Sequence, residues 1–323
     1  MRFDGYDSVL YHHPLGIGDA KFANWFEVLL EDRAGRLWAG SRAGLQEFDR
    51  ITEHFTRYTH DPKNPESLSN NIVYALHEDS KGDFWVGTLG GGVNRFDRDR
   101  GTFARIGTDP GQEMATSFCE DREGVLWVGT FAGVARYDRG SEKLIALTGR
   151  EQGLLQLTCD TVTSLCGDRR GNLWVGTVRG VNRTDPTRST CVQYKPEEGV
   201  PGTVAAGPVL SIVEDAYGGI WLSIAGKGIY RYDADRDAFD HFKHNKYDLN
   251  TPRTNDIGRL FAEQSQDTPG SSTLIWMPGQ ELGKLIVHKN LFTYYEGIAD
   301  STLVEKQNWI FRIVVDEIGA VWL

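Results

Sequence analysis

The chain of 323 residues has few cysteines, few methionines and no long apolar segment. Its four cysteines show neither the spacing of a metal site nor that of a redox motif. No apolar run approaches the roughly 20 residues that a membrane-spanning helix needs. The N-terminus has no basic-then-apolar pattern of a secretory signal. We therefore expect either a cytosolic protein or an excised piece of a longer one.

Positive charge is also scarce: the chain has 35 Lys and Arg residues but 45 Asp and Glu residues, and its formal net charge is −10. This balance repels a phosphate backbone, and no basic cluster offsets it, so nucleic acid is excluded as a partner. No nucleophile with its base and no carboxylate pair can be recognised. The glycines at 90–92 connect two expected strands, unlike a phosphate-binding loop. We therefore expect no enzymatic activity and no cofactor.

Two patterns bear on metal binding, and both are weak. Asp233, Asp235 and Asp237 are spaced like the start of a calcium loop, but the required glycine is missing and His244 stands where a glutamate is needed. His241 lies near His244 without a third ligand in the neighbouring sequence. We expect no metal site.

What the chain has is one pattern, Asp-x-x-Gly-x-x-Trp, repeated along its whole length. Its tryptophans lie 47, 42, 47, 47, 55 and 46 residues apart. They are Trp38, Trp85, Trp127, Trp174, Trp221, Trp276 and Trp322, and the copy at Trp276 is degenerate. A period in this range with strand-like content indicates a propeller or a solenoid. A residue that recurs in every copy is best explained by the scaffold.

The second copy shows what one repeat contains. Apolar residues alternate over 72–76 and again around Phe84 and Val86, which indicates strands, and Gly and Asp turns separate four such strands. Asp79 and Gly82 fit the turn between the first two strands, because Asp caps its own backbone and Gly adopts positive φ. Trp85 then lies on the second strand and fills the gap between adjacent sheets. This unit is a β-propeller blade.

The repeat predicts an all-β, seven-bladed propeller of four-stranded antiparallel blades in one domain, residues 1–323. The expected blades are about 25–60, 72–106, 115–148, 162–195, 209–243, 257–295, and 308–323 completed by 1–13. The last blade is split because the C-terminal segment supplies two strands and the N-terminal segment the other two. We expect this pairing to close the ring and remove exposed sheet edges.

Two stretches closely resemble the repeats of two-component regulator propellers: Leu-His-Glu-Asp-Ser-Lys-Gly-Asp-Phe-Trp-Val-Gly-Thr (76–88) and Gly-Gly-Val-Asn-Arg-Phe-Asp (91–97). The linker 60–71 does so too. These propellers form the sensor regions of bacterial hybrid histidine kinases. The resemblance implies a ligand-sensing ectodomain on the periplasmic or extracellular side of the membrane. The kinase and membrane segments, and any homodimer formed through the parent protein, would lie outside this chain.

The loops between second and third strands are the natural ligand contacts, because they vary while the turns repeat. They carry Arg42, Leu89, Phe131, Arg179, Lys227, Gln280 and Glu281. Such a ring suits an anionic or sugar-like small molecule through charge-assisted hydrogen bonds and stacking. Taken one by one, these residues also fit ordinary solvated loop tips. A propeller lyase or hydrolase, or a protein-interaction platform without a small ligand, remains as an alternative.

A second polar set stands at the start of the first strands: Asn24, Asn71, Asp160, Asn255 and Asn308. We expect these side chains to tie one blade's backbone to the next rather than to bind a ligand.

Overall fold

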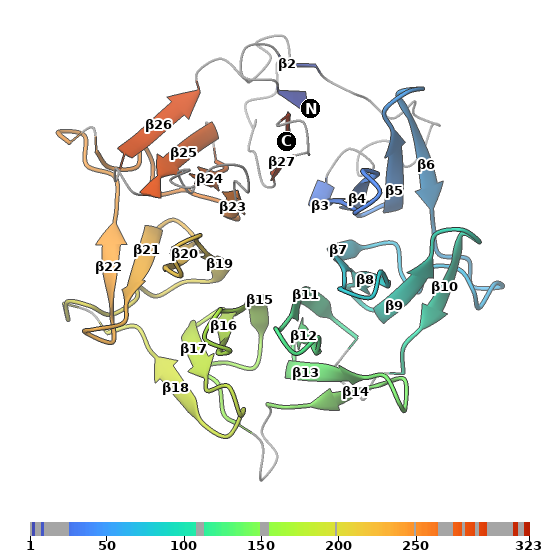
Figure 1. The fold of residues 1–323 in the computed structure, drawn as a ribbon, viewed down its shortest axis with the longest axis horizontal. Helices are drawn as coiled ribbons and strands as arrows, with labels where there is room; N and C mark the ends of the chain where they lie inside the picture. Colours follow the sequence, from blue (N-terminus) through green and yellow to red (C-terminus); the bar gives the residue numbers. More distant parts are fainter. Residues whose placement is uncertain are drawn as a thin grey trace.

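The computed structural model describes residues 2–3, 8–9, 26–107, 113–148, 155–197, 199–248, 250–263, 274–279, 282–287, 291–295, 313–315 and 320–323. The strands form four-stranded antiparallel sheets arranged around a central opening (Figure 1). The prediction of an all-β propeller with four-stranded antiparallel blades is confirmed. In the part of the chain that the structure describes, no helix is long and apolar enough to span a membrane.

The first three blades follow the sequence in order. Blade one contains β3 (Phe26–Glu31), β4 (Leu37–Ser41), β5 (Gly44–Asp49) and β6 (His54–Tyr58). Blade two contains β7 (Val73–Glu78), β8 (Phe84–Thr88), β9 (Gly92–Asp97) and β10 (Thr102–Arg105). Blade three contains β11 (Ala115–Glu120), β12 (Leu126–Thr130), β13 (Gly133–Asp138) and β14 (Lys143–Ala146).

The next three blades repeat this order. Blade four contains β15 (Val162–Gly167), β16 (Leu173–Thr177), β17 (Gly180–Thr184) and β18 (Cys191–Tyr194). Blade five contains β19 (Val209–Glu214), β20 (Ile220–Ile224), β21 (Gly228–Asp233) and β22 (Ala238–Phe242). Blade six contains β23 (Phe261–Glu263), β24 (Leu274–Met277), β25 (Leu282–Ile286) and β26 (Leu291–Tyr295).

The remaining sheet joins the two ends of the chain through four two-residue strands. Its order is β2 (Ser8–Val9), β1 (Arg2–Phe3), β28 (Val321–Trp322) and β27 (Val314–Val315). Arg2 lies opposite Trp322 in the antiparallel pair of β1 and β28. The structure thus shows six blades where the sequence predicts seven, and the two ends of the chain form a further sheet of four short strands.

The two ends of the ring differ in what they collect. The Asp-x-x-Gly turns between first and second strands lie at one end, which we call the turn side. The loops between second and third strands lie at the other end, which we call the loop-tip side. The first strand of each blade lines the central opening (Figure 1). In five blades this strand carries a bulge near its start, as between Val73 and Ala75. Because Val73 pairs with Thr88 at the end of β8, the bulge lies on the loop-tip side.

The repeated tryptophans pack between blades, as the sequence predicts. Trp38 of blade one is fully buried and lies 5.1 Å from the Phe84 ring of blade two. Trp85 meets Tyr137 of blade three at 4.6 Å between ring centroids. Trp322 packs on Phe48 of blade one at 5.4 Å, which connects the C-terminal strands to the first blade. Aromatic surface removed from water in this way is the main stabilising contribution at each interface.

The turns hold their tryptophans through a bond that the sequence pattern did not predict. In blade two, Oδ1 of Asp79 accepts from the backbone N–H groups of Lys81 and Asp83, while Oδ2 accepts from the indole Nε1 of Trp85 at 2.8 Å. Gly82 has a φ of 84°, as the turn requires. The same indole-to-carboxylate bond, 2.7–3.0 Å long, recurs in blades one, three, four and five. In the degenerate blade six, Glu263 accepts from Trp276 at 2.8 Å.

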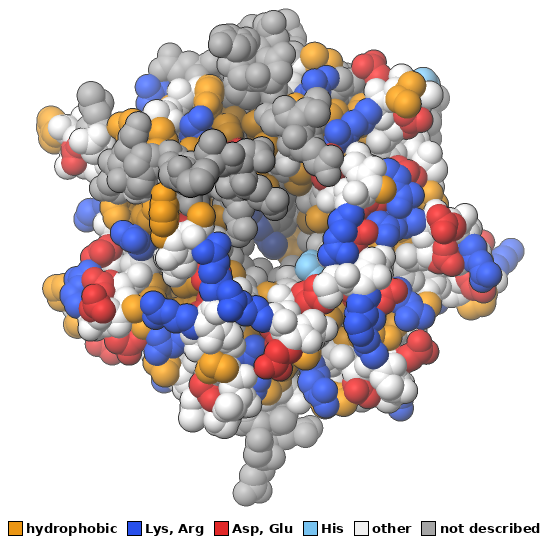
Figure 2. Space-filling view, viewed as in Figure 1, with side chains coloured by type: hydrophobic (Ala, Val, Ile, Leu, Met, Phe, Trp, Pro, Cys, Tyr) orange, Lys and Arg blue, Asp and Glu red, His pale blue; other side chains and the backbone are white. Residues whose placement is uncertain are grey.

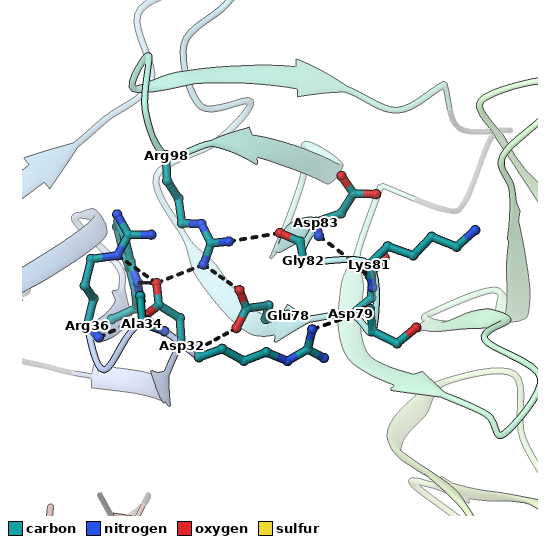
Figure 3. Close-up of polar contacts among 12 residues, drawn as sticks. Asp32, Ala34, Arg36, Glu78, Asp79, Lys81, Gly82, Asp83 and Arg98 are labelled. Carbon is teal, nitrogen blue, oxygen red and sulfur yellow. Dashed lines mark hydrogen bonds and ion pairs between the residues drawn. The ribbon is translucent and has the colours of Figure 1, made fainter. Parts of the chain in front are cut away.

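An arginine of one blade also pairs with the turn carboxylate of the preceding blade, an arrangement that we call the latch (Figure 3). Arg98, on the turn between β9 and β10, donates to Oδ2 of Asp32 in blade one at 2.8 Å and contacts Glu78 at 2.7 Å. Its other terminal nitrogen donates to the Gly82 carbonyl at 2.9 Å. Glu78 also accepts from the backbone N–H of Arg33 at 2.7 Å. Each buried carboxylate is thus shared between its own turn and the neighbouring blade.

The latch recurs at the next two interfaces and then stops. Arg139 of blade three pairs with Asp79, and Arg188 of blade four pairs with Asp121 at 3.2 Å. Blade five has Ala234 at the position of Arg98, and Oδ2 of Asp168 accepts instead from Asn172 in its own turn at 2.8 Å.

Candidate functional site

The loop-tip residues predicted as ligand contacts are not equivalent. The Arg42 side chain is half exposed, and its Nε donates to Oε1 of Glu27 at 3.0 Å. Leu89 is partly buried and bridges to Met114 at the start of the next blade. Phe131 exposes 44% of its surface. Of these three, Phe131 offers a free apolar face, whereas Arg42 and Leu89 already have protein partners.

Two further tips are exposed cations. Arg179 and Lys227 reach solvent, and the Lys227 carbonyl accepts a hydrogen bond from Nε2 of His241 at 2.6 Å. Gln280 and Glu281 lie outside the described residues. The described tips therefore carry three cations and no acid, although the protein as a whole has a net charge of −10. The acid Asp256, in the connection that precedes β23, lies beside Gly226 at the loop tip of blade five.

The polar set at the start of the first strands is structural where it can be followed. Oδ1 of Asn71 accepts from the backbone N–H of His60 at 2.7 Å, and Oδ1 of Asn255 accepts from that of His244 at 2.7 Å. Both bonds fasten the long connection that precedes a first strand. Asn24 and Asn308 lie outside the described residues. The interpretation of this set as backbone ties thus holds for Asn71 and Asn255.

A polar cluster lies in the central channel beneath the loop tips. The guanidinium of Arg259, just before β23, stands 5.2 Å from the ring centroid of Tyr74, on the bulge of β7. Because β7 and β23 lie on opposite sides of the opening in Figure 1, this contact crosses the channel. Glu27, on the equivalent bulge of β3, is close enough to act electrostatically on Arg259. We call Glu27, Tyr74 and Arg259 the channel cluster.

The environment of Arg259 is unusual for a charged group. Burial lowers the pKa of its guanidinium, while Tyr74 and Glu27 favour the charged form. Among the residues that the structure describes, no carboxylate lies within ion-pairing distance of Arg259. Figure 2 shows the viewed face hollowed at the centre of the ring, with Lys and Arg side chains around and within the hollow. A partly buried cation without a carboxylate partner among the described residues is a candidate for binding an anion.

Sequence reasoning missed this cluster, although a signal for it exists. The bulge residue is Thr116 in blade three and Thr163 in blade four, and both hydroxyls bond backbone carbonyls. Blades one and two place Glu27 and Tyr74 there instead. In each blade the repeated tryptophan pairs with one residue of the first strand. Two positions before that residue, blades three to five have a serine, whereas blade six has Arg259. These departures from the repeat become visible only once the register of the first strands is known.

The described histidines do not join the cluster. They have partners elsewhere: His54 on the Thr52 carbonyl, His60 on the Leu68 carbonyl, His77 on the Phe118 ring, His241 on the Tyr230 ring and His244 on the Pro252 carbonyl. The channel cluster thus combines a phenol, a carboxylate and a guanidinium. This set suits the binding of a polar or anionic group.

Cysteine and acidic clusters give no sign of a metal centre in the described ranges. No group of three or more His, Cys, Asp or Glu residues there is placed to hold a metal ion. The four cysteines are free thiols, and burial raises the pKa of Cys119 to about 12. Cys119 instead accepts a hydrogen bond from the Gly167 backbone of the next blade at 2.9 Å.

A second hollow, of about 910 Å³, lies against β9 and β10. It is rich in arginine, but each guanidinium has a partner within the protein. The pairs are Arg36 with Asp32, Arg95 with Glu142, Arg98 with Asp32 and Glu78, Arg100 with Asp97, and Arg105 with the Ser67 carbonyl. This hollow therefore adjoins the latch between blades one and two.

Comparison with known proteins supports the resemblance seen in the repeats. Residues 67–90, 110–132 and 156–179 match the family model described as two component regulator propeller. No curated protein matches the sequence.

Solved structures share the fold at low sequence identity. The extracellular domain of the hybrid two component system BT3049 from B. thetaiotaomicron is 17% identical with a TM-score of 0.71, covering 93% of this chain and 38% of that one. That of BT4673 from the same organism is 20% identical with a TM-score of 0.52, covering 85% and 44%. The chain thus spans about two fifths of these domains. Virginiamycin B lyase from Staphylococcus aureus is 14% identical with a TM-score of 0.58, covering 82% and 79%.

Proposed function

We propose that this chain, which carries two-component regulator propeller repeats, is a ligand-sensing propeller of a bacterial two-component sensor. The matched repeats and the similarity to extracellular domains of two-component systems support this assignment. The same similarity supports a periplasmic or extracellular location. Kinase output and membrane attachment would then belong to other parts of the parent protein.

The channel cluster is the observation that carries this proposal. Arg259, Tyr74 and Glu27 come from three blades, so a molecule bound among them contacts distant parts of the ring at once. Binding would favour one arrangement of blades or of neighbouring domains over another, and the attached output domain would respond to that change in population. A ligand shifts such an equilibrium only by its difference in affinity for the two arrangements.

We also propose that the sheet of β2, β1, β28 and β27 is a seventh blade that closes the ring. The pairing of Arg2 with Trp322 and the packing of Trp322 on Phe48 support this proposal. Deleting residues 1–13 should lower the melting temperature by many degrees, since it exposes the edge of β28. An unchanged midpoint would mean that the ring is held without these strands.

A thermal-shift screen of glycans and metabolites tests the sensing function. At least one compound should raise the melting temperature of the whole chain, and Arg42→Ala or Arg179→Ala should reduce that shift. Arg100→Ala is the matched control, because Arg100 is an exposed arginine on a turn-side loop. The absence of any shift across the panel would contradict ligand sensing and favour an interaction platform. Chromatography of the bound compound after incubation would reveal conversion if the propeller were a lyase or hydrolase.

A further inference from the structure

We propose that the channel cluster binds an oxyanion, a carboxylate or sulfate group of a small molecule, with Arg259 as its anchor. This inference rests on the proposed sensing function and names the ligand chemistry of that site. It starts from a charge that the described part of the protein leaves without a carboxylate partner.

The first step is the cost of keeping Arg259 where it is. A cation removed from bulk water is unfavourable unless it is paired and hydrogen-bonded. Arg259 has the Tyr74 ring at 5.2 Å, and a cation–π contact offsets only part of that cost. Glu27, the nearby acid, accepts from Arg42 at 3.0 Å. The carboxylate of Glu27 therefore has Arg42 as a direct partner and acts on Arg259 only through its electrostatic effect.

The second step is the geometry of recognition. A guanidinium has five N–H donors in a planar fork that matches the two oxygens of a carboxylate or sulfate. Tyr74 can engage only part of that fork, so donors remain for a ligand. The Tyr74 phenol is a hydrogen-bond partner of Arg259 and so orients the guanidinium across the channel. The cluster therefore offers charge-assisted hydrogen bonds, which are stronger than neutral ones, to a single oxyanion.

The third step is access. The bulges that carry Glu27 and Tyr74 lie on the loop-tip side, so the cluster is reached from that mouth. Exposed Arg179 and Lys227 stand among the tips on this side. Exposed cations near a binding site raise the local concentration of anions even when the whole protein is acidic. The partly exposed Phe131 ring adds a surface on which a sugar or other planar body can stack.

Binding measurements on the whole chain test this inference. Isothermal titration uses sodium galacturonate as the carboxylate probe, sodium sulfate as the sulfate probe and galactose as the neutral match, at constant ionic strength. We expect one or both anions to bind and galactose to bind at least about tenfold more weakly. Arg259→Gln should weaken the affinity for the anion at least about tenfold, because a charged hydrogen-bonding partner is lost. Tyr74→Phe should weaken it by less.

The control variant is Arg253→Gln. Arg253 lies 5.1 Å over the Tyr294 ring in the same blade, at an exposed position. The substitution therefore removes the same charge from the same kind of contact. Its anion affinity should equal that of the unmodified protein. Arg259→Lys, which keeps the charge, should retain part of the affinity. Arg259→Gln should also leave the thermal midpoint unlowered, because it removes an enclosed charge that has no carboxylate partner among the described residues.

Each outcome decides the question. Binding of galacturonate alone assigns a carboxylate ligand, and binding of sulfate alone assigns a sulfate ligand. Equal anion affinity in Arg259→Gln and Arg253→Gln would overturn the inference, as would failure of both anions to bind. If galactose binds and the anions do not, the oxyanion site is rejected while ligand sensing stands. A large fall in midpoint for Arg259→Gln would show that Arg259 is a structural clamp instead.

Discussion

The turn side and the loop-tip side of this ring are built from the same strands but follow opposite rules. On the turn side, the same aspartate accepts from the same indole in five blades, and arginines from neighbouring blades close on three of those carboxylates. On the loop-tip side, equivalent positions hold Arg, Leu, Phe, Arg and Lys. The aspartates of the repeated turns are buried and paired, whereas Arg259 beneath the loop tips has no carboxylate partner among the described residues.

This difference shows how repetition separates stability from recognition. Every interface between blades must solve the same packing problem, so a solution that works is repeated. A ligand contacts several blades at once and is not itself repetitive, so the residues that bind it must differ from blade to blade. We therefore expect turn-side substitutions to change stability and loop-tip substitutions to change binding.

The largest effect should come from the tryptophans. Trp85→Ala removes a fully buried ring that packs on Tyr137 and donates to Asp79, and the free energy of unfolding should fall by about 3–5 kcal/mol. Phe131→Ala removes a partly exposed ring at a loop tip and should change it by no more than about 0.5 kcal/mol. Urea unfolding followed by fluorescence measures both. Similar losses in the two variants would remove the distinction between the sides.

A smaller effect should come from the latch. Arg98→Met leaves the buried Asp32 and Glu78 without their shared cation, and unfolding free energy should fall by about 1–3 kcal/mol. The matched substitution at the loop-tip side, Arg179→Met, should change it by at most about 0.5 kcal/mol. The same denaturation experiment compares them. An unchanged free energy of unfolding in Arg98→Met would mean that the desolvation cost of the ion pair cancels its stabilising contribution.

The smallest effect concerns pH. Burial raises the pKa of Asp79, but hydrogen bonds from Trp85 and Arg139 outweigh burial, so the net pKa lies below its ordinary value; the pKa of Asp32 is lowered likewise. A lowered folded-state pKa stabilises the fold above the ordinary value near 4 and loses that contribution as pH falls toward the folded pKa. Stability should therefore decline below about pH 5. Asp79→Asn should lower stability at pH 7 and flatten that decline, measured by thermal melts from pH 7 to pH 3. An unaltered slope would assign the acid sensitivity to other groups.

The fold was largely predictable from the sequence because its signal is repeated. The spacing of the tryptophans, the glycines of the turns and the apolar alternation of the strands all describe local structure, and they predicted an all-β propeller of four-stranded antiparallel blades. The latch was not predictable from one copy, because Arg98 and Asp32 lie in different blades and meet only when the ring forms. Glu263, which substitutes for the repeated aspartate, lies outside the seven-residue pattern for the same reason.

The candidate site was predictable only in part. Sequence reasoning named Arg42, Arg179 and Lys227 as ligand contacts, since loop tips are recognised by their position in the repeat, and these residues stay a prediction. It did not find Tyr74 and Arg259, because 185 residues separate them and only closure of the ring brings them across one channel. The bulge that directs Tyr74 also shifts the alternation of β7, which hides its orientation in the linear pattern.

The most direct test of the division between the two sides is to measure thermal midpoint and anion affinity in parallel on Arg259→Gln and Arg98→Met. We predict that Arg259→Gln loses binding of the anion at an unlowered midpoint, while Arg98→Met binds it normally at a reduced midpoint. The account would be contradicted if Arg98→Met lost binding while its midpoint held, or if Arg259→Gln melted early and still bound the anion.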